Sequence, residues 1–361
     1  MTFDYPDRVD RLQTLMAESE VDVTLLSIGA DLPYFTGYEV MPSERLTVFV
    51  VPRIGDRVLF VPDLEAPRVE PGEFEVRAWA ETDDPVALAA DLAAPSRVAV
   101  DDHMWSVFLT RFQKEWTDAD WLPASELTRD LRMRKDEAEI ELLRRAAHAV
   151  DRVMERIPKE VTFAGRTEND VARHLAALTL EEGHDTAEFG IVASGPNGAS
   201  PHHHGGGRVI EDGDLVVCDF GGRLGGYFSD STRTFVVGSP GAEKSDVHAV
   251  VEAANQAGRD AVAPGVACQE VDRAARKVIE DAGYGEFFVH RTGHGIGLEV
   301  HEHPYMVEGN HWELDSGMTF SVEPGVYIPG SFGVRIEDIV VCTNEGLESL
   351  NQSNRGLVAV A

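Results

Sequence analysis

A plan of two amphipathic helices followed by apolar strands occurs twice in the second part of this 361-residue chain. In the first copy the helices are predicted at 140–157 and from Thr167, whose spacing to Asp170 is typical of a capping box. The second copy places helices at 244–262 and 268–282. Because each apolar stripe must be buried against another element, the two copies predict one catalytic domain with pseudo-twofold halves.

Apolar segments after each helix pair are predicted as strands. Pro158 is expected to lie beyond the end of the first helix, because proline does not continue a helix easily. The expected strands are Phe189–Ala193 and Leu215–Phe220 in the first copy, and Met318–Val322 and Val334–Val341 in the second.

The first part of the chain reads as a separate small α/β domain. A length of 361 residues with 43% apolar composition is enough for two cores. The polar stretch 123–135 is interpreted as a linker, so the domains are expected at 1–130 and 131–361. The elements predicted in the first domain are helices at 7–19 and 84–94 and strands at Val23–Ile28, Leu46–Val51, Arg57–Val61 and Arg97–Val100.

The net charge of −31 argues against several kinds of partner. The chain has 63 acidic and 32 basic residues, and only five of the basic residues are lysine. A surface this acidic repels nucleic acid and anionic membranes, and it repels itself until salt screens the charge. We interpret the charge as a halophilic adaptation to a high-salt cytoplasm.

A cytoplasmic location is expected. The N-terminus lacks the basic start and apolar core of a signal peptide, and no apolar run approaches the roughly 20 residues that span a bilayer. Cys218, Cys268 and Cys342 are widely spaced, which indicates neither a disulfide framework nor a thiolate zinc site. We expect all three to be small buried apolar residues.

Two aspartates mark the first segment that carries chemistry. Asp219 ends an apolar strand, and glycines indicate a turn between it and Asp230, eleven residues later. A hairpin would bring the two carboxylates face to face. A charge at the end of a buried strand is costly unless it is paired or binds a metal. Taken alone, the pair also fits turn aspartates that accept hydrogen bonds from backbone amides.

Three further segments carry candidate ligands. The string from His290 to His301, HRTGHGIGLEVH, threads three histidines with glycines, which suits a loop approached closely by other backbone. Glu323 ends an apolar strand, and strand alternation places Arg335 and Glu337 on one face of another. The glycines mimic a phosphate-binding loop, but the strand-to-helix context of such a loop is missing.

Together these positions form an oxygen-rich set with one nitrogen donor. Four carboxylates can cancel the charge of two divalent ions, and the mix suits manganese, cobalt(II) or zinc. Two ions roughly 3.5–4 Å apart can share a bridging water, lower its pKa and polarise a carbonyl, which is hydrolytic chemistry. The five expected ligands are Asp219, Asp230, His294, Glu323 and Glu337.

These segments resemble a metallopeptidase family with the pita-bread fold, which includes prolidases, aminopeptidase P and methionine aminopeptidases. The string HRTGHGIGLEVHE is especially similar to prolidase and aminopeptidase P, and the similarity covers essentially the whole chain. RLQTLMAESEVDVTLLS resembles the family's N-terminal domain, and LRMRKDEAEIELLRRAA its domain junction. The resemblance implies an α/β (α+β) chain with an N-terminal creatinase/prolidase-like domain at 1–130 and a catalytic pita-bread domain with αα-β halves at 131–361.

The resemblance also implies a role for each expected ligand. Asp219 would be a terminal ligand of one metal, and Asp230 and Glu337 would bridge both metals. His294 and Glu323 would bind the other metal, and Glu323 would also accept or relay the proton of the attacking water. Manganese(II) is the first expectation, with cobalt(II) or zinc(II) as alternatives, and the family implies a homodimer.

Four more residues match functional positions of the family. His202 matches a histidine that contacts the substrate and shuttles protons. His301 matches the histidine that stabilises the tetrahedral intermediate, which is an oxyanion role. His290 is expected to line the same pocket, and Arg335 matches an arginine that orients the site.

The implied reaction is hydrolysis of the bond between an N-terminal residue and proline in a small peptide. The N-terminal domain favours prolidase or aminopeptidase P over methionine aminopeptidase. A dipeptidase must bind a free C-terminal carboxylate, for which arginine is the natural partner. Some prolidases similar to this chain have an arginine after VHE-x-P, where this chain has Tyr305. Length and the HRTGHGIGLEVHE string still slightly favour an Xaa-Pro dipeptidase over an aminopeptidase P that acts on longer peptides.

Other classes of function stay open as alternatives. Creatinase-like relatives hydrolyse a C–N bond of creatine without the metal ligands, and some relatives use the fold with metal for other small-molecule chemistry. Further relatives bind proteins without catalysis. All five ligand positions are filled in this chain, which favours the metallopeptidase.

Overall fold

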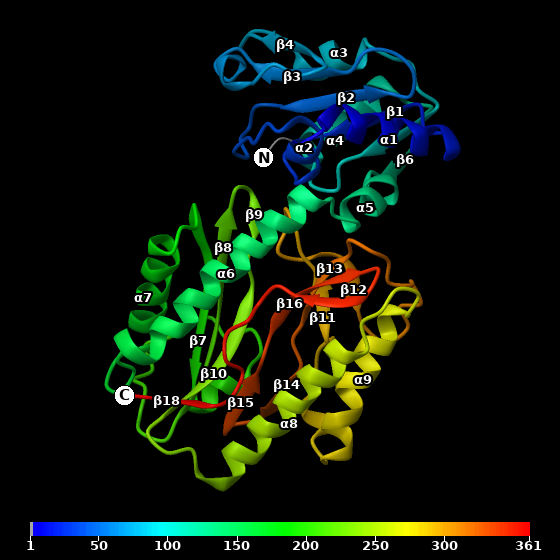
Figure 1. Ribbon diagram of the computed structural model, residues 1–361. Coiled ribbons are helices and arrows are strands. Elements are labelled where there is room, and N and C mark those ends of the chain that lie inside the picture. Colours follow the sequence, from blue (N-terminus) through cyan, green and yellow to red (C-terminus); the bar gives the residue numbers. More distant parts are fainter. Residues whose placement is uncertain (1–2) are drawn as a thin grey trace. The chain divides into compact units, whose positions relative to one another are not determined.

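A six-stranded mixed sheet organises the first of the two units into which the chain divides, Met1–Arg132 and Met133–Ala361. The computed structural model describes residues 3–361 (Figure 1). The strands are β1 (Val23–Leu26), β2 (Val48–Pro52), β3 (Val58–Pro62), β4 (Glu75–Trp79), β5 (Arg97–Val100) and β6 (Asp120–Pro123). Their order is β4-β3-β2-β1-β5-β6, with β1 antiparallel to β2 and parallel to β5. The expected α/β character of this part is confirmed.

Short helices accompany this sheet. Phe108 and Phe112 pack from a helix against strand residues such as Leu25 and Val50 in one buried core. The helices are α1 (Tyr5–Glu18), α2 (Asp31–Thr36), α3 (Pro85–Ala90), α4 (Ser106–Glu115) and α5 (Ser125–Met133), with one 3₁₀ turn at η1 (Ala66–Arg68).

The stretch 123–135, which was interpreted as a linker, is mostly the helix α5, and the division between the two units falls within it, between Arg132 and Met133. Leu127 and Leu131 are four residues apart and lie on the same face of the helix, and both are buried. The carbonyl of Leu131 accepts a hydrogen bond from Tyr34 Oη at 3.1 Å, and Thr128 donates to Asp31 at 2.8 Å. Because most residues of the stretch are polar, the apolar face formed by Leu127 and Leu131 is not apparent from the sequence.

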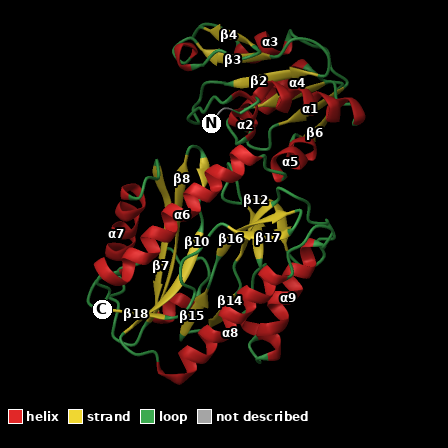
Figure 2. Ribbon diagram, in the orientation of Figure 1, coloured by secondary structure: helices red, strands yellow, loops and turns green. Residues whose placement is uncertain are grey.

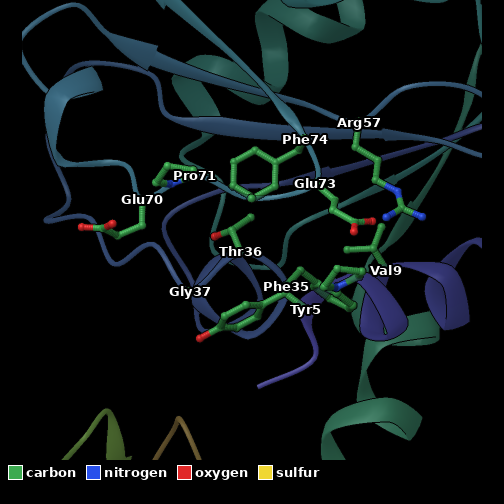
Figure 3. A pocket seen from close by; sticks show the side chains of 12 residues that line it. Tyr5, Val9, Phe35, Thr36, Gly37, Arg57, Glu70, Pro71, Glu73 and Phe74 are labelled. Atoms are coloured by element: carbon green, nitrogen blue, oxygen red, sulfur yellow. The ribbon is translucent and has the colours of Figure 1, made fainter. Parts of the chain in front are cut away.

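A pocket of about 510 Å³ lies in the first unit. Figure 3 shows Phe74 on one side of the hollow and Tyr5 and Phe35 on the other. Arg57 and Glu73 also line it. Neither histidine nor cysteine is among its described lining residues.

Two main sheets form the second unit. The first has the order β18-β10-β8-β7 with β9 paired to β8, the second has the order β12-β11-β13-β16-β17, and β14 pairs with β15. The strands are β7 (Thr186–Ser194), β8 (Leu215–Leu224), β9 (Tyr227–Phe228), β10 (Ser231–Val237), β11 (Gly293–Gly295), β12 (Glu302–Met306), β13 (Thr319–Val322), β14 (Gly325–Ile328), β15 (Phe332–Arg335), β16 (Asp338–Thr343), β17 (Gly346–Ser349) and β18 (Val358–Val360).

Four long helices lie around the strands of the second unit in the described part of the chain (Figure 2). Helices α6 and α7 contact β8 and β7, whereas α8 contacts β13 to β15 and α9 contacts β12. Each half therefore has two helices followed by a sheet, as the repeated plan predicted. The helices are α6 (Glu137–Glu160), α7 (Glu168–Glu181), α8 (Gly241–Asp260) and α9 (Cys268–Asp281), with 3₁₀ turns at η2 (Gly195–Ala199) and η3 (Gly285–Phe287).

Local signals in the helices were mostly predicted well. Thr167 caps α7 and forms a capping box with Asp170. The expectation that the first helix ends before Pro158 is wrong, because α6 continues to Glu160. A proline in the last turn removes only one intrahelical hydrogen bond, and the N–H of Val161 still donates to Ile157.

The strand expected at 334–341 is two strands rather than one. The segment ends its pairing with β14 at Arg335 and begins a new pairing with β13 at Asp338. Ile336 packs in the apolar core, whereas Arg335 and Glu337 both line one cavity. The shared face predicted for this pair is therefore correct, although the strand is interrupted between them.

The three cysteines are free and buried, as expected. Within the described residues, no helix is both long enough and apolar enough to cross a bilayer.

Candidate metal centre

The five expected ligands line one cavity of about 850 Å³ in the second unit. Three of them lie just outside a strand, whereas Asp219 and His294 lie within paired strands, so the expectation that Asp219 ends its strand is wrong: β8 continues to Leu224. Asp219 lies in β8, Asp230 directly precedes β10, His294 lies in β11, Glu323 directly follows β13, and Glu337 lies between β15 and β16. The first half of the unit thus supplies two carboxylates, and the second half supplies the imidazole and the other two.

His294 is oriented as a metal ligand would be. Its Nδ1 lies 3.1 Å from the carbonyl oxygen of Gly295, which selects the tautomer that donates from Nδ1. The remaining lone pair on Nε2 then faces the carboxylates, at 3.4 Å from Glu323, 3.6 Å from Asp230 and 4.0 Å from Glu337. The imidazole is 2% exposed.

The glycines beside His294 have a steric cause. A Cβ on Gly293 would meet the carbonyl oxygen of Ser321 at 1.8 Å, and one on Gly295 would meet that of His303 at 2.2 Å. Backbone from β13 and β12 therefore approaches β11 from both sides. This explains the G-H-G spacing in the sequence, because only glycine allows three strands to pack so closely around the imidazole.

Several carboxylate oxygens in this cavity have no hydrogen-bond partner among the described residues. They are Asp219 Oδ1, Asp230 Oδ1 and Glu337 Oε1. Buried polar atoms are normally satisfied, so oxygens left without donors indicate a missing ligand. Asp230, His294 and Glu337 each offer a ligand atom, and these atoms all lie within 4.8 Å of one another. The residues therefore fit a divalent cation well.

The charges in the cavity repel one another. Burial, followed by the charges of Glu337 and Asp219, raises the pKa of Asp230 well above its ordinary value. Burial, followed by Glu323 and Asp219, does the same to the pKa of Glu337. Burial also raises the pKa of Glu323 to about 7. Such crowding is unfavourable without a compensating positive charge, which divalent cations supply.

Arg335 connects the ligands to a tyrosine and a histidine. Its guanidinium forms an ion pair with Asp219, donates to Thr232 Oγ1 at 3.1 Å and donates to Tyr327 Oη at 2.9 Å. Tyr327 Oη lies 2.8 Å from Nε2 of His290, whose Nδ1 lies 2.7 Å from the carbonyl of Arg291. His290 is therefore held in one orientation. Burial lowers its pKa to about 3, with Arg335 as a further cause, so it is neutral.

His202 and His301 lie at the exposed side of the same cavity. The ring of His301 is centred 4.0 Å from that of His294. Burial, followed by Arg291, lowers the pKa of His301 below its usual value. Both histidines are positioned to meet a molecule that enters the cavity.

A buried carboxylate holds the loop that carries His202. Glu168, the first residue of α7, is fully buried. It accepts hydrogen bonds from Ser194 N and Oγ, both at 2.7 Å, from Gly206 N at 3.2 Å and from the side chain of Asn197. His203 Nε2 also donates to it at 3.0 Å. We call this set the Glu168 hub.

The Glu168 hub shows that His203 has a structural contact of its own. Burial alone would raise the pKa of Glu168, but its hydrogen bonds from Ser194, His203 and Asn197 outweigh that effect and lower it. The carboxylate is therefore ionised at neutral pH and fixes the histidine loop.

Sequence reasoning missed several residues that line or support the cavity. Thr232 donates to Glu337 Oε2 at 2.7 Å, and Tyr327 bonds to Arg335. Thr232 and Glu337 are 105 residues apart in the sequence, and Tyr327 and Arg335 are 8 residues apart. Arg291 also lines the cavity. The remaining wall consists of Glu188, Phe189, Ile191, Pro201, Phe228 and Val300.

Family comparison agrees with this geometry. The sequence profile described as Metallopeptidase family M24 matches residues 141–344. The profile described as the Creatinase/Prolidase N-terminal domain matches residues 8–134.

Individual proteins with similar sequences span nearly the whole chain. A probable dipeptidase PepE of Mycobacterium bovis is 41% identical over 99% of this chain and 96% of its own length. An Xaa-Pro dipeptidase of Lactobacillus helveticus is 34% identical over 97% of this chain and 98% of its own. The crystal structure of a prolidase from Thermococcus sibiricus superposes with a TM-score of 0.96 at 35% identity, covering 100% of both chains. The expected pita-bread fold is confirmed.

Proposed function

Because the chain belongs to metallopeptidase family M24, we propose that it hydrolyses the Xaa-Pro bond of small peptides at a dinuclear metal site. The observation that carries the proposal is the cluster of buried carboxylates around Nε2 of His294, in which one oxygen each of Asp230 and Glu337 has no donor among the described residues. The names of the similar proteins, a dipeptidase, an Xaa-Pro dipeptidase and a prolidase, support the substrate class.

The metal ligands would be those expected from the sequence. Manganese(II) is proposed first, with cobalt(II) or zinc(II) as alternatives, because four carboxylates and one imidazole suit these ions. When bound, two such ions would polarise the scissile carbonyl and lower the pKa of the attacking water. The proposed ligands are Asp219, Asp230, His294, Glu323 and Glu337.

The chain's own side chains would complete the reaction. Glu323 would accept the proton of the attacking water at a carboxylate oxygen and pass it toward the leaving nitrogen. His301 would stabilise the negative charge that develops on the carbonyl oxygen, and His202 would contact the substrate and shuttle a proton. Arg335 would hold Asp219 in place through its ion pair, and His290 would remain a neutral wall of the pocket.

The dipeptidase is proposed ahead of the aminopeptidase. Two of the compared proteins carry dipeptidase in their names, whereas Tyr305 replaces the arginine that some prolidases use for the substrate carboxylate. That replacement is the observation that favours an aminopeptidase P acting on longer peptides. The domain division at 130/131, the homodimer and the cytoplasmic location remain predictions.

Hydrolysis assays test the proposal directly. The protein, stripped with a chelator and then reloaded with Mn(II), is expected to cut Leu-Pro faster than Leu-Pro-Gly, whereas the stripped protein is inactive. The reason is that the crowded carboxylates cannot polarise a carbonyl without cations. Amino-acid release measured by chromatography, with Leu-Gly as a control peptide, gives the readout. Cleavage of the tripeptide alone would replace the dipeptidase by the aminopeptidase, and undiminished turnover after chelation would refute the metal mechanism.

The halophilic interpretation predicts a salt effect on stability. The melting temperature is expected to rise by several degrees between about 0.1 M and about 3 M KCl, because ions screen the repulsion among 63 acidic side chains. For domains of this size, 1 kcal/mol corresponds to roughly 2–4 °C. Scanning calorimetry measures the shift, and sucrose at matched water activity serves as a control. A melting temperature indifferent to KCl would contradict the interpretation.

A further inference from the structure

Two consecutive residues of β7, Glu188 and Phe189, both line the catalytic cavity. In a regular strand, neighbouring side chains point to opposite faces of the sheet. Phe189 and Ile191 follow that alternation, because they are two residues apart and both line the cavity. Glu188 does not follow it, so its side chain can reach this face only where the backbone of the strand is irregular.

A β-bulge supplies that irregularity. Ala187 pairs with Gly222 of the antiparallel strand β8. Phe189 pairs with Gly221, the residue just before, so Glu188 is one extra residue with no partner opposite it. Bulges turn a side chain in a new direction, and they are frequent beside active sites. The bulge therefore places a carboxylate in the wall of the cavity.

The carboxylate of Glu188 has no cationic partner in the described part of the chain. Glu188 is exposed, and its Oε1 accepts a hydrogen bond from Thr186 Oγ1 at 2.6 Å. This bond restricts the carboxylate and leaves Oε2 available to another donor. Exposed acidic groups are common in a chain with 63 of them, so the charge alone indicates nothing. What distinguishes Glu188 is that a bulge turns it into the cavity of the proposed metal ligands.

The cavity wall near Glu188 is apolar. Phe189 is its neighbour in the chain, and Ile191 and Phe228 line the same cavity. Phe228 belongs to β9, which pairs with β8 as β7 does. Lysine and arginine combine an apolar methylene stem with a charged end, so they pack on apolar surface while the charge meets an anion. An apolar wall that carries one carboxylate matches such a side chain.

We propose that Glu188 binds the positively charged side chain of a lysine or arginine at the first position of the peptide. The proposal rests on the proposed function, since it names the substrate class of that site. In an Xaa-Pro dipeptide only the first side chain can carry a charge, because the second is the proline ring. Glu188 would then be a specificity-determining residue that contacts the substrate away from the bond that is cut. The N-terminal ammonium, which every peptide has, is the other positive group that the experiment must separate.

The experiment compares Mn(II)-loaded wild type with Glu188→Gln on Arg-Pro and citrulline-Pro, which have nearly the same shape but differ in charge. Wild type is expected to favour Arg-Pro by about fivefold in kcat/KM, mainly through KM, because a solvent-accessible ion pair is worth no more. E188Q should bring this ratio close to one through a loss on Arg-Pro. Lys-Pro and norleucine-Pro should show the same pattern. An equal loss on Arg-Pro and citrulline-Pro would assign the N-terminal ammonium to Glu188 and overturn the proposal.

Two further variants guard against a merely structural effect. Glu188→Lys should reverse the preference, so that Glu-Pro is cut about fivefold better than Gln-Pro. Glu345→Gln changes an exposed acid in the same unit and should leave every ratio as in wild type. The wild-type preference for Arg-Pro should also shrink between about 0.1 M and about 1 M KCl, because salt screens an exposed pair. A folded E188K protein without any reversal would count against a charge-reading role.

Binding measured without turnover separates this proposal from the proposed function. Isothermal titration of the Mn(II)-loaded protein with arginine and citrulline should show tighter binding of arginine to wild type and equal binding of both to E188Q. A wild type that discriminates in this way but cuts no Xaa-Pro peptide would refute the proposed function alone. A wild type that cuts Leu-Pro but treats arginine and citrulline alike, both as ligands and within dipeptides, would overturn the role of Glu188 alone.

Discussion

Glu337→Gln is expected to lower kcat/KM on Leu-Pro by roughly 10³-fold or more while it raises the melting temperature of the metal-free protein. The substitution keeps the acceptor for Thr232 Oγ1, which lies 2.7 Å from Oε2, so the fold should persist. It removes an ionisable group from a crowded site, where burial and then Glu323 and Asp219 disfavour the charged form and raise the pKa of Glu337 well above its ordinary value.

The sign of the stability effect follows from that shift. A carboxyl whose pKa is raised in the folded state stabilises the fold at low pH and loses that contribution as the pH rises through the raised pKa. Metal-free wild type is therefore strained near neutral pH, and the neutral glutamine relieves the strain. With Mn(II) present, wild type should melt at a higher temperature than Glu337→Gln, because ion binding stabilises the wild-type fold more than that of the variant.

The measurement is calorimetry with and without Mn(II), together with the peptide assay. Glu286→Gln is the matched control, because Glu286 is exposed in the same unit and should change neither quantity. Wild-type turnover in Glu337→Gln, or a metal-free variant less stable than metal-free wild type, would argue against a cation-binding carboxylate cluster.

Asp338→Asn is expected to cost about 3–5 kcal/mol of unfolding free energy, because it breaks a buried ion-pair network. Asp338 is fully buried and accepts from Arg233 Nη2 at 2.7 Å and from Arg355 Nε at 2.6 Å. An asparagine amide would leave at least one guanidinium without its anion. Arg233 also donates to the carbonyl of Glu337 at 2.7 Å, so activity should fall too.

The pH dependence of this contribution has a definite direction. Burial would raise the pKa of Asp338, but Arg233 and Arg355 outweigh it and hold the pKa below its usual value. The carboxylate therefore stabilises the fold at neutral pH, and this stabilisation is lost as the pH falls through the depressed folded pKa. The gap between wild type and Asp338→Asn should accordingly narrow in acid.

An exposed ion pair supplies the control. Glu308 pairs with Arg273 at 2.6 Å, and its side chain is 59% exposed, so Glu308→Gln should cost far less unfolding free energy than Asp338→Asn. Urea unfolding followed by fluorescence compares the two variants. If Asp338→Asn and Glu308→Gln lowered the free energy of unfolding by similar amounts, burial would not determine how much an ion pair stabilises this fold.

Much of the fold could be predicted from periodicity because its elements are long or strongly capped. The helix pairs and the capping box at Thr167 are local features, and the structure has them. The helix at 125–133 was missed because its apolar stripe consists of Leu127 and Leu131 among polar neighbours. The break between Arg335 and Asp338 depends on two different partner strands, which spacing along one strand does not reveal.

The sequence predicted the five candidate ligands that line the cavity, but not the residues that support them. Charged or metal-ligating side chains within or beside apolar strands are costly unless they have a partner, and this made five residues recognisable: Asp219, Asp230, His294, Glu323 and Glu337. The contacts of Thr232, Tyr327 and Glu168 join segments distant in the chain, and a threonine or tyrosine in an apolar strand looks like ordinary core. Arg291 was not recognised as a cavity residue, because the three histidines of the string HRTGHGIGLEVH already accounted for that segment.

The Glu168 hub has a consequence for attempts to transplant substrate preference between relatives. Five donors from four residues of one connecting segment, 194–206, end on a single anion that belongs to a different element, α7. A replacement segment without side-chain donors at positions 194, 197 and 203 would leave the buried Glu168 charge with backbone donors alone. Segment 194–206 and the first turn of α7 therefore have to be exchanged together. Chimaeras that exchange both should express, whereas chimaeras that exchange the segment alone should not.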